Sequence, residues 1–326
     1  MSNIAVDKRT IFVTGASGFV GTALINRLRN DSRFQVRAIS RRALSIDGVE
    51  ALIGQNLGPD ATWTNAIRDT DTVVHLAARV HVMRDSTVDP LAEFRNVNTA
   101  GTQRLARDAA AAGVRRFIYL SSIKVNGENT DPGRPFRERD DPAPADLYGI
   151  SKFEAEIALG HIGRQTGMEI VTIRPPLVYG PGVKANFRRM MQWLYRRVPL
   201  PFGAIDNRRT LIGLDNLVDL ITTCISHPRA GNEVFLAGDG EDLSTSDLLE
   251  RLGLALGRQA RLIPVPAVLL RLALGALGQR DVAQRLCGWL QVDISRARDV
   301  LSWDPPVSVD EGLRRVANDF VTRLSQ

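Results

Sequence analysis

The chain has 326 residues, of which 44% are hydrophobic and 24% charged, so it is long and apolar enough for one large folded domain or two ordinary ones. Its net charge of +6 comes from scattered arginines without a basic stripe interleaved with aromatics, which argues against nucleic acid as a partner and favours small anionic ligands. The two cysteines lie far apart, so we expect no disulfide scaffold and no metal site. The sequence has neither an apolar signal core nor an apolar run long enough to span a bilayer. We therefore expect a cytoplasmic protein with no stable membrane insertion.

Short apolar segments alternate with amphipathic ones through the first half of the chain. Apolar runs predict strands over residues 10–14, 34–39, 72–76, 117–120 and 169–173. Apolar residues at helical spacing predict helices over residues 19–29, 94–112 and 147–165. This alternation predicts an α/β fold, a Rossmann-type doubly wound parallel sheet with helices on both faces.

The regular alternation of apolar and amphipathic segments ends at a cluster of proline and glycine over residues 175–182. We predict a dinucleotide-binding domain over 1–175 and a smaller C-terminal α/β substrate lobe over 176–326, with the chain returning to the first domain near 211–226. The apolar stretch 263–278 contains two prolines and an arginine. We interpret it as core packing of the smaller lobe, and contact with a membrane surface is the alternative.

A glycine-rich turn directly follows the first predicted strand. Gly15, Gly18 and Gly21 stand between that strand and the first predicted helix. Glycine permits a tight turn and a close backbone approach to a pyrophosphate, and a helix N-terminus offers unpaired N–H groups to an anion. The placement therefore predicts a dinucleotide phosphate site, whereas a glycine triplet elsewhere would be weak evidence.

The second predicted strand ends in Ser40, Arg41 and Arg42. NAD sites often place a carboxylate here for the ribose hydroxyls. Two guanidiniums without a carboxylate suit a 2′-phosphate, so NADP(H) is favoured over NAD(H). The alternative is a pair of ordinary surface arginines in an arginine-rich chain.

Tyr148 and Lys152 stand four residues apart at the start of a predicted helix and share one of its faces. An ammonium beside a phenol lowers the phenol pKa from about 10, which suits proton exchange with a sugar hydroxyl or ketone. Ser121 and Ser122 follow the strand predicted over 117–120, at the edge where parallel sheets bind ligands. Without further signals, a surface Tyr–Lys pair and strand-end serine caps are the commoner cases.

Together these motifs resemble the extended short-chain dehydrogenase/reductase superfamily, in its nucleotide-sugar branch. The matching segments are TGASGFVG (14–21), HLAA (75–78), Asn98 with Gly101-Thr102, SSIKVNG (121–127), YGISK (148–152), RPPLVYGPG (174–182), residues 207–221 and residues 301–313. The resemblance implies a catalytic set of Ser122, Tyr148 as acid/base and Lys152 as its partner. The cofactor contacts that it implies are Gly15, Ser17, Gly18, Phe19, Val20, Gly21, Ser40, Arg41, Arg42, Asn56, Leu57, Leu76, Ala77, Ala78, Asn98, Tyr148, Lys152 and Pro175.

The resemblance also implies substrate contacts. Asn186 and Arg209 align with positions that hold the nucleotide diphosphate, and Arg285 is a weaker candidate. Leu177 replaces an asparagine common in relatives, which puts one diphosphate contact in doubt. Sugar dehydratases carry two acids where this chain has Ile123 and Lys124, so dehydration is rejected, and Lys124 becomes a candidate sugar or phosphate contact.

Three functions remain open. We favour reduction of a UDP-4-keto-6-deoxy-N-acetylhexosamine for O-antigen or exopolysaccharide synthesis, because the arginine pair suggests NADP(H) and a reductase consumes its reductant. A UDP-hexose 4-epimerase acting on UDP-glucose or UDP-GlcNAc uses the same residues and is the alternative. A non-catalytic NADP(H)-sensing protein is the alternative of another class. The family pairs subunits through two helices, here near 94–112 and 147–165, so a homodimer is expected.

Overall fold

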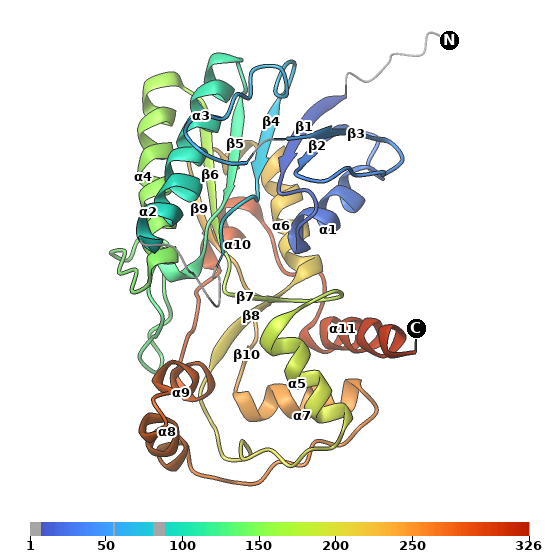
Figure 1. Cartoon of the computed structure of the whole chain (residues 1–326), viewed down its shortest axis with the longest axis vertical. Coiled ribbons are helices and arrows are strands. Elements are labelled where there is room, and N and C mark those ends of the chain that lie inside the picture. Colours follow the sequence, from blue (N-terminus) through green and yellow to red (C-terminus); the bar gives the residue numbers. More distant parts are fainter. Residues whose placement is uncertain (1–7, 55, 81–88, 326) are drawn as a thin grey trace.

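The computed structural model describes residues 8–54, 56–80 and 89–325 and shows an upper α/β lobe and a lower, mainly helical one (Figure 1). The upper lobe is built on a seven-stranded sheet in which every neighbouring pair is parallel. Its strands, in spatial order, are β3 (Val49–Ile53), β2 (Phe34–Ser40), β1 (Arg9–Thr14), β4 (Thr72–His75), β5 (Arg116–Leu120), β6 (Glu169–Arg174) and β9 (Val234–Leu236). The predicted Rossmann-type sheet is confirmed, and β3 and β9 are two strands that the sequence analysis missed.

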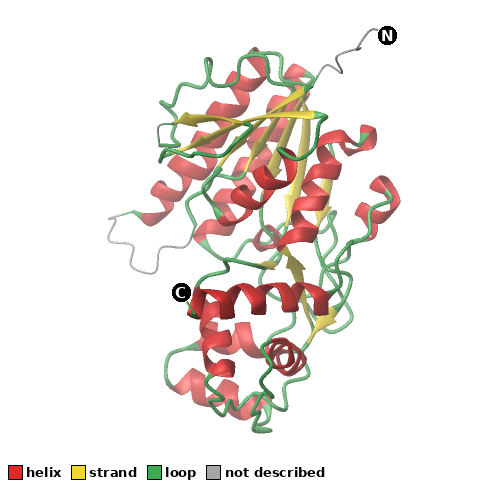
Figure 2. Cartoon of the chain, turned by 90° about the vertical axis from the view of Figure 1, so that its right-hand side faces the viewer, coloured by secondary structure: helices red, strands yellow, loops and turns green. Residues whose placement is uncertain are grey.

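Helices cover both faces of this sheet (Figure 2). One face packs on α1 (Phe19–Leu28) and α6 (Leu214–Ser226), and the other on α3 (Gly101–Ala111) and α4 (Leu147–Thr166). Ile11 and Val13 enter the first core, whereas Phe12 enters the second. Because both faces are buried, the central strands are continuously apolar instead of alternating with polar residues.

The helix predicted over 94–112 is three successive segments. They are α2 (Pro90–Phe94), a π-helical turn (Arg95–Ala100) and α3. The wider turn brings Asn98 into the interior, where it is 1% exposed.

The lower lobe, drawn below the large sheet in Figure 1, packs around a separate hydrophobic cluster. A three-stranded sheet is formed by β7 (Leu177–Tyr179), β8 (Arg209–Gly213) and β10 (Asp242–Leu243). Its helices are α5 (Ala185–Tyr195), α7 (Thr245–Ala255), α8 (Ala267–Ala276), α9 (Arg280–Cys287) and α11 (Val309–Leu324), while α10 (Ser295–Leu301) lies near β9. The chain passes between lobes more than once, because β8 runs directly into α6 and β9 then pairs with β6.

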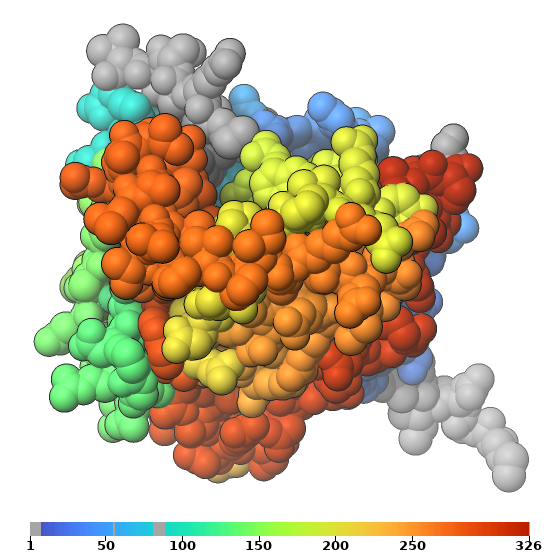
Figure 3. All heavy atoms as spheres, turned by 90° about the horizontal axis from the view of Figure 1, so that it is seen from below, coloured from blue at the N-terminus to red at the C-terminus, as the bar shows by residue number. Residues whose placement is uncertain are grey.

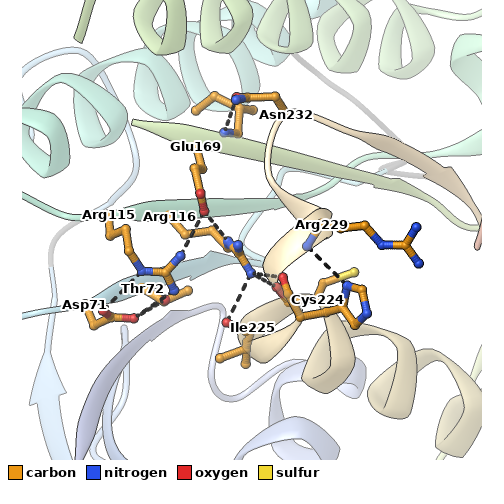
Figure 4. A network of polar contacts seen from close by, with 11 residues as sticks. Asp71, Thr72, Arg115, Arg116, Glu169, Cys224, Ile225, Arg229 and Asn232 are labelled. Carbon is orange, nitrogen blue, oxygen red and sulfur yellow. Dashed lines mark hydrogen bonds and ion pairs between the residues drawn. The ribbon is translucent and has the colours of Figure 1, made fainter. Parts of the chain in front are cut away.

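An ionic network joins these returning segments to the amino ends of the central strands (Figure 4). Arg116, at the start of β5, is 1% exposed and pairs with Glu169 at 2.7 Å. Its guanidinium also donates to the carbonyl oxygens of Cys224, Ile225 and His227, where α6 ends. The network therefore fixes α6 to the sheet at the edge opposite the glycine turn.

Candidate active site

The glycine turn is shaped by close backbone contacts. Gly15 has a φ of +69°, and a Cβ there would lie 2.7 Å from the amide nitrogen of Ala77. A Cβ on Gly21 would lie 2.2 Å from the carbonyl oxygen of Gly15. Gly18 caps α1 without a side-chain hydrogen bond, so the first N–H groups of the helix have no side-chain acceptor. This bare helix start fits a dinucleotide pyrophosphate. The other predicted contacts of the turn, Ser17, Phe19 and Val20, lie at its tip and in the first turn of α1.

The predicted adenosine side lies at the ends of β2 and β3. Ser40 is buried, while Arg41 and Arg42 are exposed and form no ion pair with a described residue. Asn56 is exposed and Leu57 is half-buried. Two exposed guanidiniums without an ion pair to any described residue therefore stand at the end of β2.

The segment after β4 borders the glycine turn. Residues 76–78 are half-buried, and the Ala77 amide donates to the Thr14 hydroxyl at 3.3 Å. Asn98 is predicted as a cofactor contact, but its amide groups are engaged within the protein. It accepts from the Arg79 amide and donates to the Arg79 carbonyl and to the Ser151 hydroxyl. The structure thus shows Asn98 as a brace between this segment and α4.

Lys152 is 2% exposed, and its Nζ lies 4.1 Å from the centre of the Tyr119 ring. Burial lowers the pKa of Lys152 to about 7, against an opposing effect of Glu156. Burial, with a contribution from Asp146, raises the pKa of Tyr148 to about 12. The prediction that Lys152 lowers the Tyr148 pKa is therefore wrong for the isolated chain, because desolvation outweighs any gain from the ammonium.

The stacked rings of His75 and Tyr119 form an uncharged aromatic floor beneath Lys152. The His75 ring stacks on Tyr119 with centroids 5.9 Å apart and hydrogen-bonds to Thr14 at 2.7 Å and Thr102 at 2.9 Å. Burial, followed by the charge of Lys152, lowers the pKa of His75 to about 3. His75 is therefore neutral at physiological pH, and Lys152 is the group of this layer that can carry a positive charge there.

Ser122 follows β5 and is half-buried. Its hydroxyl accepts from the Lys124 amide at 3.3 Å. Pro175 is buried and directly follows β6. Its carbonyl oxygen accepts a hydrogen bond from the Ile123 amide at 3.0 Å, which fixes the segment that carries Ser122. The hydroxyl of Ser122 can still donate to a bound oxygen.

A buried ion pair that the sequence analysis missed supports the catalytic helix. Glu156, one turn after Lys152 on α4, pairs with Arg174 of β6 at 2.6 Å, and their side chains are 9% and 5% exposed. Arg174 also donates to Asn126, and Ser121 donates to Glu156. This network locks α4 onto the ends of β5 and β6. The sequence signal that could have revealed Glu156 is its spacing of four residues from Lys152, which places both side chains on one face of the helix.

The predicted substrate contacts differ in their surroundings. The Lys124 ammonium donates hydrogen bonds to Asp146 and to Glu128. Burial alone would lower the pKa of Lys124, but these two carboxylates outweigh it and raise the pKa. Arg209 donates to the Gly288 carbonyl at 3.0 Å, and burial together with Arg285 lowers its pKa. Arg209 and Arg285 form no ion pair with a described carboxylate. Asn186 is exposed in the first turn of α5.

The contacts described above join the glycine turn, the 76–78 segment, Tyr119 and the start of α4 at one edge of the sheet. A glycine turn at a helix start, with a Tyr–Lys pair at the carboxyl ends of the central strands, defines a nucleotide-binding enzyme of Rossmann type. The comparisons with known proteins agree. The sequence model of the NAD dependent epimerase/dehydratase family matches residues 11–238, and the chain belongs to this family.

Known relatives match nearly the whole chain. A UDP-glucose 4-epimerase of Vibrio cholerae is 45% identical over 315 residues, which cover 96% of each chain. A UDP-glucose 4-epimerase of Mycolicibacterium smegmatis is 30% identical, covering 94% of this chain and 97% of the relative. The solved structure of MoeE5 in complex with UDP-glucose and NAD is 25% identical, with a TM-score of 0.77, and covers 97% of this chain and all of that one.

Proposed function

We propose that the chain is a UDP-hexose 4-epimerase with a resident nicotinamide dinucleotide. One observation supports this proposal most directly. Helix α4 packs Lys152 against the aromatic floor of β4 and β5, at the edge of the sheet that carries the glycine turn, and Tyr148 lies one turn earlier on the same helix. The two relatives described above, both called UDP-glucose 4-epimerase, support this reading over the reductase favoured by the sequence analysis.

Each predicted catalytic side chain has a distinct part in this chemistry. The nicotinamide, when bound, exchanges a hydride with sugar C4. Tyr148 takes the proton of the C4 hydroxyl and returns it after the keto sugar has turned its other face. A positive charge on Lys152 favours the phenolate, and Ser122 donates a hydrogen bond to the reacting oxygen. Arg209 and Arg285 suit the diphosphate.

Reduction of a UDP-4-keto sugar is the second candidate. Its specific support is the exposed pair Arg41 and Arg42, which form no ion pair within the described part of the chain and suit the 2′-phosphate of NADP(H). A non-catalytic cofactor sensor would bind the dinucleotide without turnover. The homodimer through α3 and α4 stays a prediction.

The test incubates the purified chain separately with UDP-glucose, with UDP-GlcNAc and with UDP-4-keto-6-deoxy-GlcNAc plus NADPH, and follows the sugar products together with NADPH absorbance. Epimerised product without net cofactor change is expected. Net oxidation of NADPH by a UDP-4-keto-6-deoxy sugar, with no epimerisation, would favour the reductase instead. Tyr148→Phe is expected to lose about 10²-fold or more of the turnover while it still binds cofactor. Binding without turnover on any sugar nucleotide would favour the sensor.

A further inference from the structure

Helix α8 carries its apolar side chains outward. Val268, Leu269 and Leu272 are 63%, 55% and 66% exposed, whereas Leu270 is buried. The interpretation of residues 263–278 as core packing is therefore wrong for most of this helix. Leu270 is the buried residue of α8 and joins a small cluster with Ile205 and Cys287, against which the partly buried Ala267 also packs. The helix lies at the outside of the lower lobe (Figure 3).

The exposed side chains form one continuous face. At about 100° per residue, the exposed Val268, Leu269, Leu272, Ala273 and Ala276 fall within an arc of about 140°. No charged residue falls within this arc. Soluble domains usually turn the polar face of a helix to water, so this inverted arrangement indicates a partner that is itself apolar.

The stretch of chain that carries this apolar face is strongly basic. Residues 261–285 contain four arginines, all exposed, and a single acid, Asp281. They are Arg261, Arg271, Arg280 and Arg285. Arg271 uses part of its guanidinium to donate to the Cys287 carbonyl at 2.7 Å and so ties α8 to the end of α9. The apolar face therefore belongs to an exposed stretch of chain with a net positive charge, and Arg271 lies on α8 itself, outside the apolar arc.

We propose that α8 docks on the surface of an anionic phospholipid membrane. An apolar helix face within an exposed, arginine-rich stretch of chain matches acyl chains and anionic phosphate headgroups. A second copy of the chain is a poorer partner, since a two-fold contact through α8 would bring the positive charges of this stretch in both copies together. The helix has ten residues, and no described helix of the chain combines the length and apolarity needed to cross a bilayer, so α8 would lie flat.

Docking through α8 would hold one end of the lower lobe at the membrane. The next helix, α9, follows α8 with a short connection and carries Arg285, one of the predicted diphosphate contacts. The upper lobe, with the glycine turn, would remain on the aqueous side (Figure 1).

The test is co-sedimentation of the full chain with vesicles of phosphatidylcholine alone or mixed with phosphatidylglycerol. Binding to the anionic vesicles is expected, weakening in high salt. The double variant Leu269→Ser/Leu272→Ser is expected to lose about tenfold or more of this binding, since it removes the centre of the face. Arg280→Gln is expected to weaken it about fivefold.

Leu254→Ser is the matched control. Leu254 is 70% exposed on α7 and lies outside the face, so this variant is expected to bind vesicles as the wild type does. Thermal melting of all variants checks that they remain folded. Absence of binding to anionic vesicles, or equal binding by the double variant, would overturn the proposal. Light scattering that shows a dimer for the wild type and a monomer for the double variant would identify a self-interface and also overturn it.

Discussion

Burial governs the charge of the two side chains that begin the catalytic helix. Lys152 has exchanged water for the Tyr119 ring, and its pKa falls to about 7. A cation–π contact offsets only part of the lost hydration. Burying Lys152 therefore costs stability, and the catalytic role proposed for it is of the kind for which active sites commonly retain groups with shifted pKa values.

Replacing Lys152 by methionine is expected to stabilise the fold in acid. The native pKa of about 7 lies below the unfolded value of about 10.4, so burying the ammonium costs free energy in full below pH 7, and this cost disappears as the pH rises to about 10.4. Thermal unfolding at pH 6 should show a Tm a few degrees higher for Lys152→Met, at about 2–4 °C per kcal/mol. The gap should narrow toward pH 10, and a constant gap would contradict the assigned cause.

Glu156 is expected to act as a positioning residue. Glu156→Gln leaves Arg174 buried without its counterion, which should lower the free energy of unfolding by about 3 kcal/mol in chemical denaturation. It also removes the carboxylate that raises the Lys152 pKa, so the basic limb of the kcat profile should move to lower pH.

The control for this variant is Glu311→Gln, whose exposed carboxylate pairs with Arg314 and Arg315 on α11. It should leave both stability and the pH profile nearly unchanged. Loss of stability without a shifted profile in Glu156→Gln would indicate a purely structural part for that residue.

At the scale of elements, the glycine turn depends on how closely α1 approaches β1. An added methyl at Gly21 meets the Gly15 carbonyl oxygen at 2.2 Å, a backbone atom that cannot rotate away. Helix α1 would have to move outward, and its N–H groups would leave the phosphate position.

Gly21→Ala is therefore expected to lower cofactor affinity about tenfold or more and stability by about 1–3 kcal/mol. Fluorescence titration with the dinucleotide and denaturant unfolding measure the two effects. Gly275→Ala is the control, because its Cβ would meet nothing within 4 Å in helix α8. It should instead stabilise the chain by about 0.5–1 kcal/mol. Unchanged affinity in Gly21→Ala would contradict the phosphate site.

At the scale of the whole molecule, the returning segments complete the upper lobe. Helix α6 belongs to the second half of the sequence but covers the sheet beside α1, and β9 extends the sheet at β6. Arg116 joins these parts by bonding three carbonyl groups at the end of α6. The second half of the chain is thus required to bury one face of the dinucleotide-binding sheet.

Arg116→Leu is expected to destabilise the whole chain by about 3–5 kcal/mol, since it leaves buried carbonyl groups without donors. Chemical denaturation followed by far-UV circular dichroism measures this loss. Its neighbour Arg115 pairs with Asp71 and Glu169 with its side chain 41% exposed, so Arg115→Gln should cost less than about 1 kcal/mol. Equal effects of the two variants would show that burial is not the deciding factor.

The sequence by itself determined the central parallel strands, the glycine turn and the positions of Tyr148 and Lys152. Each of these is written in a short contiguous pattern: an apolar run, a glycine spacing or a four-residue helical interval. Local patterns are sufficient because strand, turn and helix start are set by neighbouring residues.

Only the tertiary structure decided the edge strand β9, the Glu156–Arg174 pair, the low pKa of Lys152 and the outward face of α8. These features depend on which distant segments pack together and which groups lose contact with water. An apolar run such as the one in α8 is the same in sequence whether its side chains enter a core or face outward. Burial and desolvation arise from the whole fold, so no local pattern contains them.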